Sequence, residues 1–206
     1  MIIDFDRTIA YRCARCGEIT YGDFSLFEIS GKKGISVHCA CGESNISITS
    51  KSRTSYFVEL SCVICDSPHR FSVTFDSLTK KDLSEFLCPD VSVGLAYIGK
   101  ESAVKKAVME NERAIRDVIM ACGLEHTGKN GILMLKALDK IQDLSENDSL
   151  TCSCGSKIID IEVHEDEIVL ECCLCGEKTI IDISEIRKKD FSKINKIIIG
   201  QNRRPM

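Results

Sequence analysis

Residues 152–183, CSCGSKIIDIEVHEDEIVLECCLCGEKTIIDI, determine the kind of fold that this part of the chain can adopt. Two cysteine pairs, each followed by a glycine, flank two short segments in which apolar and polar residues alternate. A period of two is typical of a half-buried β-strand, and the acidic turn HEDE between the segments completes a hairpin pattern. The sequence therefore predicts an antiparallel hairpin with a pair of thiols at each end, followed by a third strand over residues 178–183.

This arrangement of four thiols favours a metal site. Two thiolates in a C-x-C or C-x-x-C step converge on one ion at about 2.3 Å, and the glycine relieves the crowded backbone of the turn. The segment resembles a zinc ribbon, an architecture that occurs in transcription, in translation and in accessory domains of enzymes. The resemblance implies a small antiparallel sheet and structural zinc, for which we predict the ligands Cys152, Cys154, Cys172 and Cys175.

The composition supports metal chemistry in a cytoplasmic protein. The N-terminal residues MIIDFDRTIA do not form a signal peptide, and the sequence has no apolar run of the roughly 18 residues that span a membrane. Thirteen cysteines occur among 206 residues, and because cytosolic thiols are kept reduced, metal ligation explains them better than a disulfide framework. The formal charge of −4 argues against a protein that coats nucleic acid through its net charge.

The first hundred residues contain an internal repeat with an offset of 49 residues. Adding 49 carries Cys13 to Cys62, Cys16 to Cys65 and Cys39 to Cys88, and apolar positions follow the same offset. Three cysteines that match at one offset predict two tandem ribbons. The first would bind zinc through Cys13, Cys16, Cys39 and Cys41. The fourth of these ligands has no cysteine counterpart in the second repeat, where Asp90 takes its place.

A different pairing of these cysteines is compatible with their spacing. Residues 39–65 also run C-x-C, hairpin and C-x-x-C, which would place Cys39 and Cys41 on one ion with Cys62 and Cys65. Cysteines 13 and 16 would then be left with Cys88. We favour the repeat because it explains three registrations at once, and either pairing leaves Cys88 in a site with three cysteines.

The second repeat therefore predicts a third site with an incomplete set of cysteines, Cys62, Cys65 and Cys88. His69 or Asp90 could supply the fourth ligand. A water molecule in that position would leave an open coordination site suited to catalysis. The remaining alternative, which we favour at this point, is a decayed ribbon without a stable metal ion.

The predicted fold class is α+β, with three small antiparallel β zinc-ribbon units, the first two as a tandem repeat, and an inserted two-helix hairpin. Apolar residues recur at steps of three and four over much of residues 101–147, which indicates amphipathic helices. The predicted segments are residues 1–50 (first ribbon), 51–100 (degenerate second ribbon), 101–147 (helical hairpin) and 148–206 (third ribbon with a basic C-terminal tail).

The sequence favours a binding protein over an enzyme. It contains no glycine-rich phosphate loop, no dinucleotide-binding turn and no motif of the common hydrolases, so we assign no catalytic residue. The leading hypothesis is a zinc-binding scaffold or adaptor that holds two zinc ions, with a third uncertain, and binds a protein partner through ribbon or helical surfaces. One alternative is nucleic-acid binding through the tail after Ile186, which has seven Lys or Arg and one Asp. The other is a redox or zinc-dependent enzyme that uses the three-cysteine site around Cys88. The sequence leaves the choice between zinc and iron and the oligomeric state open.

Overall fold

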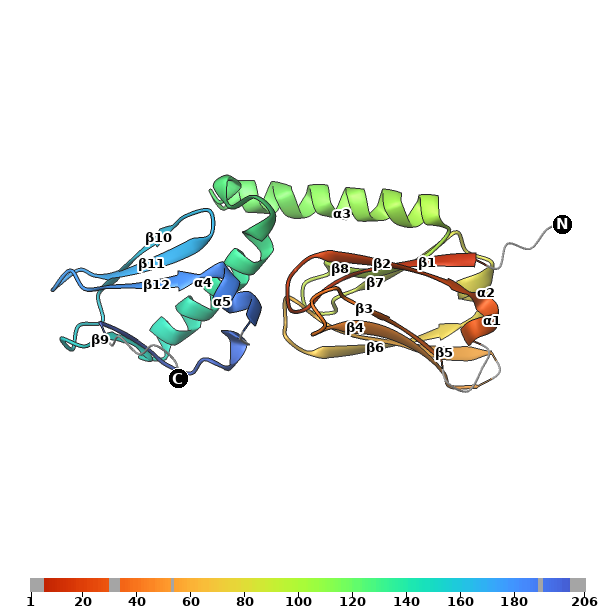
Figure 1. The fold of residues 1–206 in the computed structure, drawn as a ribbon, viewed down its shortest axis with the longest axis horizontal. Helices are drawn as coiled ribbons and strands as arrows, with labels where there is room; N and C mark the ends of the chain where they lie inside the picture. The colour runs from red at the N-terminus through yellow and green to blue at the C-terminus, as the bar shows by residue number, and fades with distance from the viewer. Residues whose placement is uncertain (1–5, 30–33, 53, 189–190, 201–206) are drawn as a thin grey trace. The chain divides into compact units, whose positions relative to one another are not determined.

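The structure, a computed structural model, describes residues 6–29, 34–52, 54–188 and 191–200 (Figure 1). These residues form small, mostly antiparallel sheets and few helices, and the helix pair α3 (Glu101–Ala121) and α4 (Gly131–Glu146) lies between two groups of strands along the chain. The predicted α+β class is therefore confirmed. The chain divides into two compact units, unit 1 (Met1–Ile115) and unit 2 (Arg116–Met206), and the finer division into four segments stays a prediction. Among the described helices, none is both long and apolar enough to cross a membrane.

Unit 1 contains both repeats, and each repeat supplies a hairpin, a short helix and a second hairpin. The first repeat has β1 (Asp6–Arg12), β2 (Ile19–Ser25), α1 (Leu26–Ile29), β3 (Ile35–His38) and β4 (Asn45–Ser50). The second has β5 (Ser55–Ser61), β6 (Pro68–Thr74), α2 (Phe75–Thr79), β7 (Leu83–Leu87) and β8 (Gly94–Gly99). Adding 49 to the bounds of β1, β2 and β4 gives those of β5, β6 and β8, since 6, 19 and 45 become 55, 68 and 94. The repeat in the sequence is therefore also a repeat of structure.

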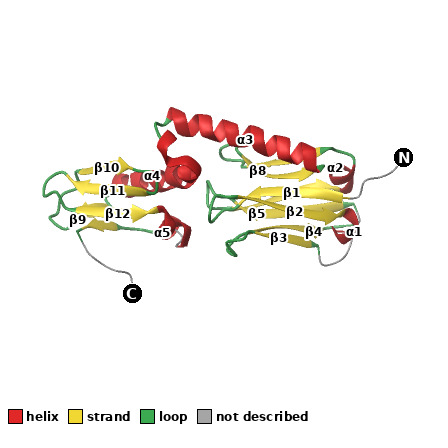
Figure 2. Cartoon of the chain, turned by 45° about the horizontal axis from the view of Figure 1, so that its top comes forward, coloured by secondary structure: helices red, strands yellow, loops and turns green. Residues whose placement is uncertain are grey.

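Each sheet of unit 1 takes one hairpin from each repeat (Figure 2). The first sheet, sheet A, has the strand order β2-β1-β8-β7, and the second, sheet B, has the order β3-β4-β5-β6. Strands β1 and β8 pair antiparallel across the repeats, and so do β4 and β5. The two repeats therefore share two sheets.

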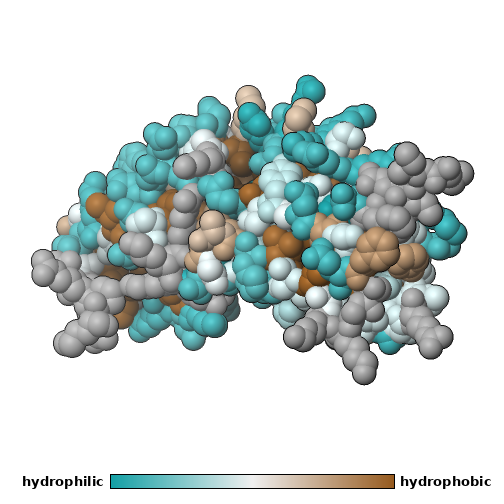
Figure 3. All heavy atoms as spheres, turned by 45° about the vertical axis from the view of Figure 1, so that its right-hand side comes forward, coloured by the Kyte–Doolittle hydropathy of each residue, from teal (hydrophilic) through white to brown (hydrophobic). Residues whose placement is uncertain are grey.

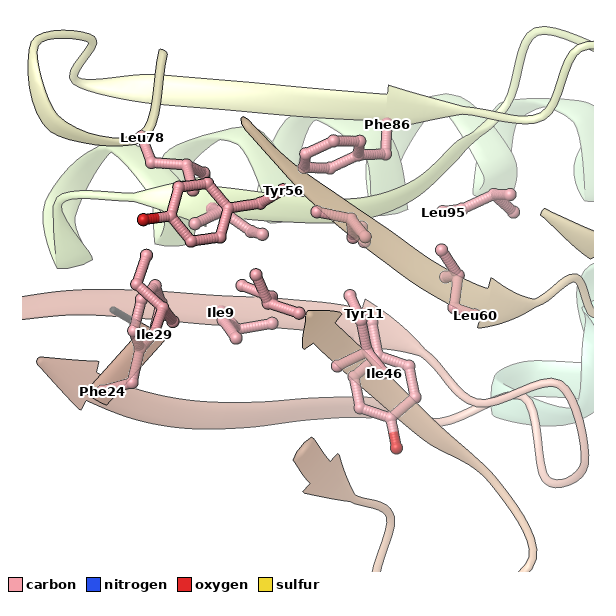
Figure 4. Close-up of a cluster of buried hydrophobic side chains, with 14 of the residues drawn as sticks. Ile9, Tyr11, Phe24, Ile29, Ile46, Tyr56, Leu60, Leu78, Phe86 and Leu95 are labelled. Atoms are coloured by element: carbon pink, nitrogen blue, oxygen red, sulfur yellow. The ribbon is translucent and has the colours of Figure 1, made fainter. Parts of the chain in front are cut away.

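The inner faces of the two sheets form the hydrophobic core of unit 1 (Figure 4). Successive side chains of a strand point to opposite faces, and this core takes Ile9 and Tyr11 from β1 and Tyr56, Val58 and Leu60 from β5. Burying one side chain of this size stabilises a fold by about 1.5–3 kcal/mol. Helices α1 and α2 lie at one end of the two sheets (Figure 1), so the turns within the four hairpins lie at the other end.

The first part of α3 covers the outer face of sheet A. Its buried residues include Val104, Ala107 and Val108. Ala107 and Val108 follow Val104 by three and four positions, so the three side chains share one face of the helix. They pack with Ala10 of β1 and Tyr97 of β8. This packing holds the first part of the helix to unit 1.

A β-bulge at Leu95 explains why Tyr97 faces α3. Strand β7 pairs Phe86 with Ala96 but Leu87 with Gly94, so Leu95 is an extra residue in β8. An extra residue shifts the rest of a strand by one position, and a shift of one reverses the face that each side chain occupies. Ile48, the counterpart of Tyr97 in the first repeat, accordingly lies in the core between the sheets.

Unit 2 combines α4 with a three-stranded sheet. Its other elements are η1 (Glu125–Asn130), β9 (Leu150–Cys152), β10 (Ile159–Val163), β11 (Glu167–Cys172), β12 (Lys178–Asp182), α5 (Ile183–Lys188), η2 (Phe191–Lys193) and β13 (Ile197–Ile199). The sheet order β10-β11-β12 confirms the hairpin and third strand predicted from the sequence. Leu133 and Ile141 of α4 and Ile168 and Leu170 of β11 are buried. Strand β13 pairs in parallel with β9, so it lies against the strand that ends at Cys152.

Candidate metal centres

The described residues contain three groups of four side chains with metal-ligand chemistry. Cluster 1 consists of Cys13, Cys16, Cys39 and Cys41, cluster 2 of Cys62, Cys65, His69 and Cys88, and cluster 3 of Cys152, Cys154, Cys172 and Cys175. In each cluster the four candidate ligand atoms lie within 4.8 Å of one another. Each cluster could therefore hold one metal ion.

Cluster 1 joins the two sheets of unit 1. The turn between β1 and β2 carries Cys13 and Cys16, and the loop between β3 and β4 carries Cys39 and Cys41. The Sγ atoms of Cys13 and Cys41 are 3.6 Å apart, and those of Cys16 and Cys39 are also 3.6 Å apart. Four sulfurs at about 2.3 Å from one ion in a tetrahedron lie about 3.8 Å apart. The spacing thus fits tetrahedral ligation of an ion between sheet A and sheet B.

Cluster 2 occupies the equivalent place in the second repeat. Cys62 and Cys65 lie between β5 and β6 of sheet B, and Cys88 lies between β7 and β8 of sheet A. His69, on β6, places its Nε2 atom 3.3 Å from the Sγ atom of Cys65. An Oδ2 atom of the exposed Asp90 lies 4.0 Å from the Sγ atom of Cys88, and this residue is not part of the group. The incomplete site predicted from the sequence therefore has four candidate donors.

Cluster 3 lies in unit 2, where β9 and the β11–β12 turn meet. The Sγ atoms of Cys152 and Cys175 are 3.5 Å apart, and those of Cys154 and Cys172 are 3.7 Å apart. The backbone N–H of Ser153 donates to the carbonyl oxygen of Ile199 at 2.9 Å, so β13 supports the first turn of this cluster. Cys152 and Cys172 are buried, and Cys154 and Cys175 are exposed.

The backbone of the cysteine turns is shaped for ligation. The N–H groups of Arg15 and Cys16 point at the Sγ atom of Cys13, at 3.3 and 3.4 Å. The four glycines that follow the cysteine pairs all have positive φ, between 73° and 88°, which explains their place in the sequence (Gly17, Gly42, Gly155 and Gly176). Asp66 adopts φ 56° at the one pair that no glycine follows.

Each cluster contains a thiol whose pKa is raised, by burial at Cys16 of cluster 1 and Cys62 of cluster 2, and by the neighbouring thiols at Cys175 of cluster 3. A hydrogen bond from the backbone N–H of Cys175 lowers the pKa of Cys172 to about 6. Burial raises the pKa of Cys39, but hydrogen bonds from the Thr20 hydroxyl and the Cys41 N–H outweigh burial and bring this pKa to about 7. In cluster 2, burial raises the pKa of Cys62 to about 12. Because a bound cation favours the thiolate, binding at cluster 2 would release a proton from Cys62.

The clusters distinguish the two pairings that the sequence left open. Cys39 and Cys41 lie with Cys13 and Cys16, as the 49-residue repeat predicts, and the rival pairing with the cysteines of β5–β6 does not occur. Cys122, which follows α3 directly, is exposed and lies outside the three clusters. The sequence interpretation also missed Thr20, whose hydroxyl reaches Cys39. Applying the repeat offset to His69 would have pointed to it.

Comparisons of the chain with protein-family models, with curated proteins and with solved structures found no match. Function has to be argued from the clusters themselves. Their donor atoms and spacing support metal binding as the general activity of this chain.

Proposed function

We propose that this chain is a zinc-binding scaffold without catalytic activity, whose zinc ions hold small β-sheets in the shape that a protein partner recognises. The observation that carries the proposal is the convergence of four thiols from two distant turns in both cluster 1 and cluster 3. A cytoplasmic location, where thiols stay reduced, is part of the proposal.

The donor set supports zinc as the metal. Thiolates are soft ligands that bind zinc and iron–sulfur clusters, whereas calcium and magnesium require oxygen donors. Structural zinc takes four protein ligands in a tetrahedron, at distances that give the sulfur spacing of clusters 1 and 3. Iron on four thiolates has the same geometry, so the metal has to be identified by elemental analysis.

The number of donors supports a structural role over catalysis. A catalytic zinc ion keeps one coordination position for water or substrate. Each of the three clusters offers four protein donors, including the cluster around Cys88 that the enzyme hypothesis would use. A zinc ion held by all four has no position left for chemistry.

The proposal predicts a defined loss of metal from single cysteine variants. Cys39→Ser and Cys172→Ser should each lower the zinc content of the purified chain by one ion, because three ligands no longer form a closed tetrahedral site. Cys122→Ser is the matched control, since this exposed cysteine lies outside the clusters and its variant should keep the full content. Elemental analysis per mole of chain is the measurement. Equal zinc content in the three variants would contradict the proposal.

Two exposed apolar side chains beside cluster 3 support a protein partner. Ile158 is 71% exposed and Leu174 is 73% exposed, and the backbone N–H of Cys173 donates to the carbonyl oxygen of Ile158 at 3.0 Å. The face shown in Figure 3 is mainly hydrophilic, with small separate hydrophobic patches. Exposed apolar side chains on a rigid turn are suited to the centre of a protein–protein interface.

We therefore expect the double variant Ile158→Ser, Leu174→Ser to lose the partner while keeping its zinc. Affinity capture with the full chain, followed by identification of the bound protein, measures the first property, and elemental analysis measures the second. Phe27→Ser in unit 1 is the control, because Phe27 is 66% exposed and lies far along the chain from cluster 3. Equal capture by the wild type and both variants would exclude this surface.

The nucleic-acid alternative stays a prediction. Most of the basic side chains after Ile186 lie outside the residues whose side chains the structure describes; Lys193 and Lys196 are within them. The strands of unit 2 are acidic, since they carry one lysine, Lys178, and five acidic residues, Asp160, Glu162, Glu167, Glu171 and Asp182. This charge does not favour contact with phosphates through the sheet.

A further inference from the structure

We propose that cluster 2 is a third metal site of the Cys3His type, in which His69 supplies the ligand that Cys41 supplies in cluster 1. The proposal deepens the zinc-scaffold function and rests on it for the class of metal. It goes further in assigning His69 as the fourth ligand and in stating that the two repeats place their fourth ligand at different positions.

The two repeats have exchanged the position of their fourth donor. Subtracting 49 from His69 gives Thr20, and adding 49 to Cys41 gives Asp90. The first repeat therefore has a cysteine in the β3–β4 loop and a small residue on the strand. The second repeat has a carboxylate in the loop and an imidazole on the strand. Each cluster has one nitrogen or sulfur donor beyond the three cysteines that the repeats share, in the β3–β4 loop for cluster 1 and on β6 for cluster 2.

The neighbouring strand has changed in step with this exchange. Tyr11 is directly opposite Thr20 in the β1–β2 pair, and Leu60 is directly opposite His69 in the β5–β6 pair. Both members of each pair point to the inner side of their sheet, because partners in register share a face. The first repeat thus pairs the large Tyr11 with the small Thr20. The second repeat pairs the smaller Leu60 with the larger His69.

The Tyr11 side chain reaches the loop of cluster 1. The ring is fully buried, and its hydroxyl donates to the carbonyl oxygen of Ser44, in the loop that carries Cys41, at 2.9 Å. Leu60 occupies the equivalent position in the second repeat, where it is also buried but has no hydroxyl to bond a loop. The residue opposite His69 is thus shorter than the residue opposite Thr20, so the two repeats differ at both members of this pair.

The distances favour His69 over Asp90 as the fourth ligand. A sulfur at about 2.3 Å and a nitrogen at about 2.0–2.1 Å from one tetrahedral ion lie about 3.6 Å apart. The observed distance from Cys65 Sγ to His69 Nε2 is 3.3 Å, and all four donors of the cluster lie within 4.8 Å of one another. Asp90 is exposed, and its nearest contact in the cluster is the 4.0 Å approach to Cys88. The imidazole is therefore inside the donor group and the carboxylate is outside it.

The ligand set can be tested on the full chain with zinc and cobalt(II) as probes. Native mass spectrometry counts the ions per chain, and the visible spectrum of the cobalt form distinguishes three sulfurs and one nitrogen from four sulfurs. We expect three ions in the wild type, one of them with the mixed spectrum. His69→Ala should lower the count to two and remove the mixed spectrum. Asp90→Ala and Cys122→Ser, a control at an exposed cysteine outside the clusters, should keep three ions.

His69→Cys keeps the test decisive if His69→Ala disturbs folding. This variant should retain three ions and convert the mixed spectrum to that of four sulfurs. The proposal is overturned if His69→Ala keeps three ions with an unchanged spectrum, if Asp90→Ala loses one, or if the wild type binds two ions and both have four sulfurs. A wild type that binds no zinc or cobalt would instead overturn the proposed function, so the two failures are distinguishable.

Discussion

Removal of the metal by a strong chelator should abolish the tertiary structure of the chain. The binding free energy of a structural zinc ion is about 10–16 kcal/mol, which is comparable with the whole net stability of about 5–15 kcal/mol of an ordinary domain. Clusters 1 and 2 join sheet A to sheet B at the end of unit 1 opposite α1 and α2. Without an ion, the thiols of each cluster lie side by side with no cation between them.

Circular dichroism and thermal melting after verified metal removal measure this effect. The cooperative transition should disappear on chelation and return when zinc is added back. Chelated Cys122→Ser protein, which cannot form a disulfide through its exposed Cys122, serves as a control against oxidation at that residue. An unchanged melting curve with no bound metal would show that the hydrophobic core is sufficient by itself.

Separating the two repeats of unit 1 should prevent either from folding as a monomer. A fragment of residues 1–50 retains β1 and β4 but loses their partners β8 and β5, and a fragment of residues 51–115 has the reverse defect. Each fragment would expose the edges of two hairpins and half of a shared core, and such edges pair with other chains. We therefore expect an equimolar mixture with zinc to form a folded one-to-one complex.

Light scattering coupled to gel filtration and amide NMR spectra distinguish the outcomes. The separate fragments should give collapsed or self-associated species, and the mixture should give dispersed spectra at the mass of a heterodimer. Two independent tandem ribbons would behave differently, because each would bind zinc and fold alone. A folded, monomeric fragment of residues 1–50 would thus contradict the shared sheets.

The local parts of this fold could be predicted from the sequence because their signals are local. The alternation in residues 158–171 predicts a hairpin, and β10 and β11 form it. The spacing of the cysteine pairs predicts turns that bring two thiols together, and the glycines after four of the pairs have the positive φ that such turns need. The 49-residue offset predicted which turns share a cluster, because a repeat carries its contacts with it.

The sequence by itself determined the strands β10, β11 and β12, the cysteine turns and the repeat, since each depends on residues within a few positions of one another or at one fixed offset. Only the tertiary structure decided that β1 pairs with β8, because strands almost a hundred residues apart have no pattern that names their partner. It likewise decided that a bulge at Leu95 turns Tyr97 toward α3. For the site around Cys88 it decided that His69 lies within the group of donors and Asp90 outside it. That grouping depends on the packing of two sheets, which the spacing of residues along the chain does not record.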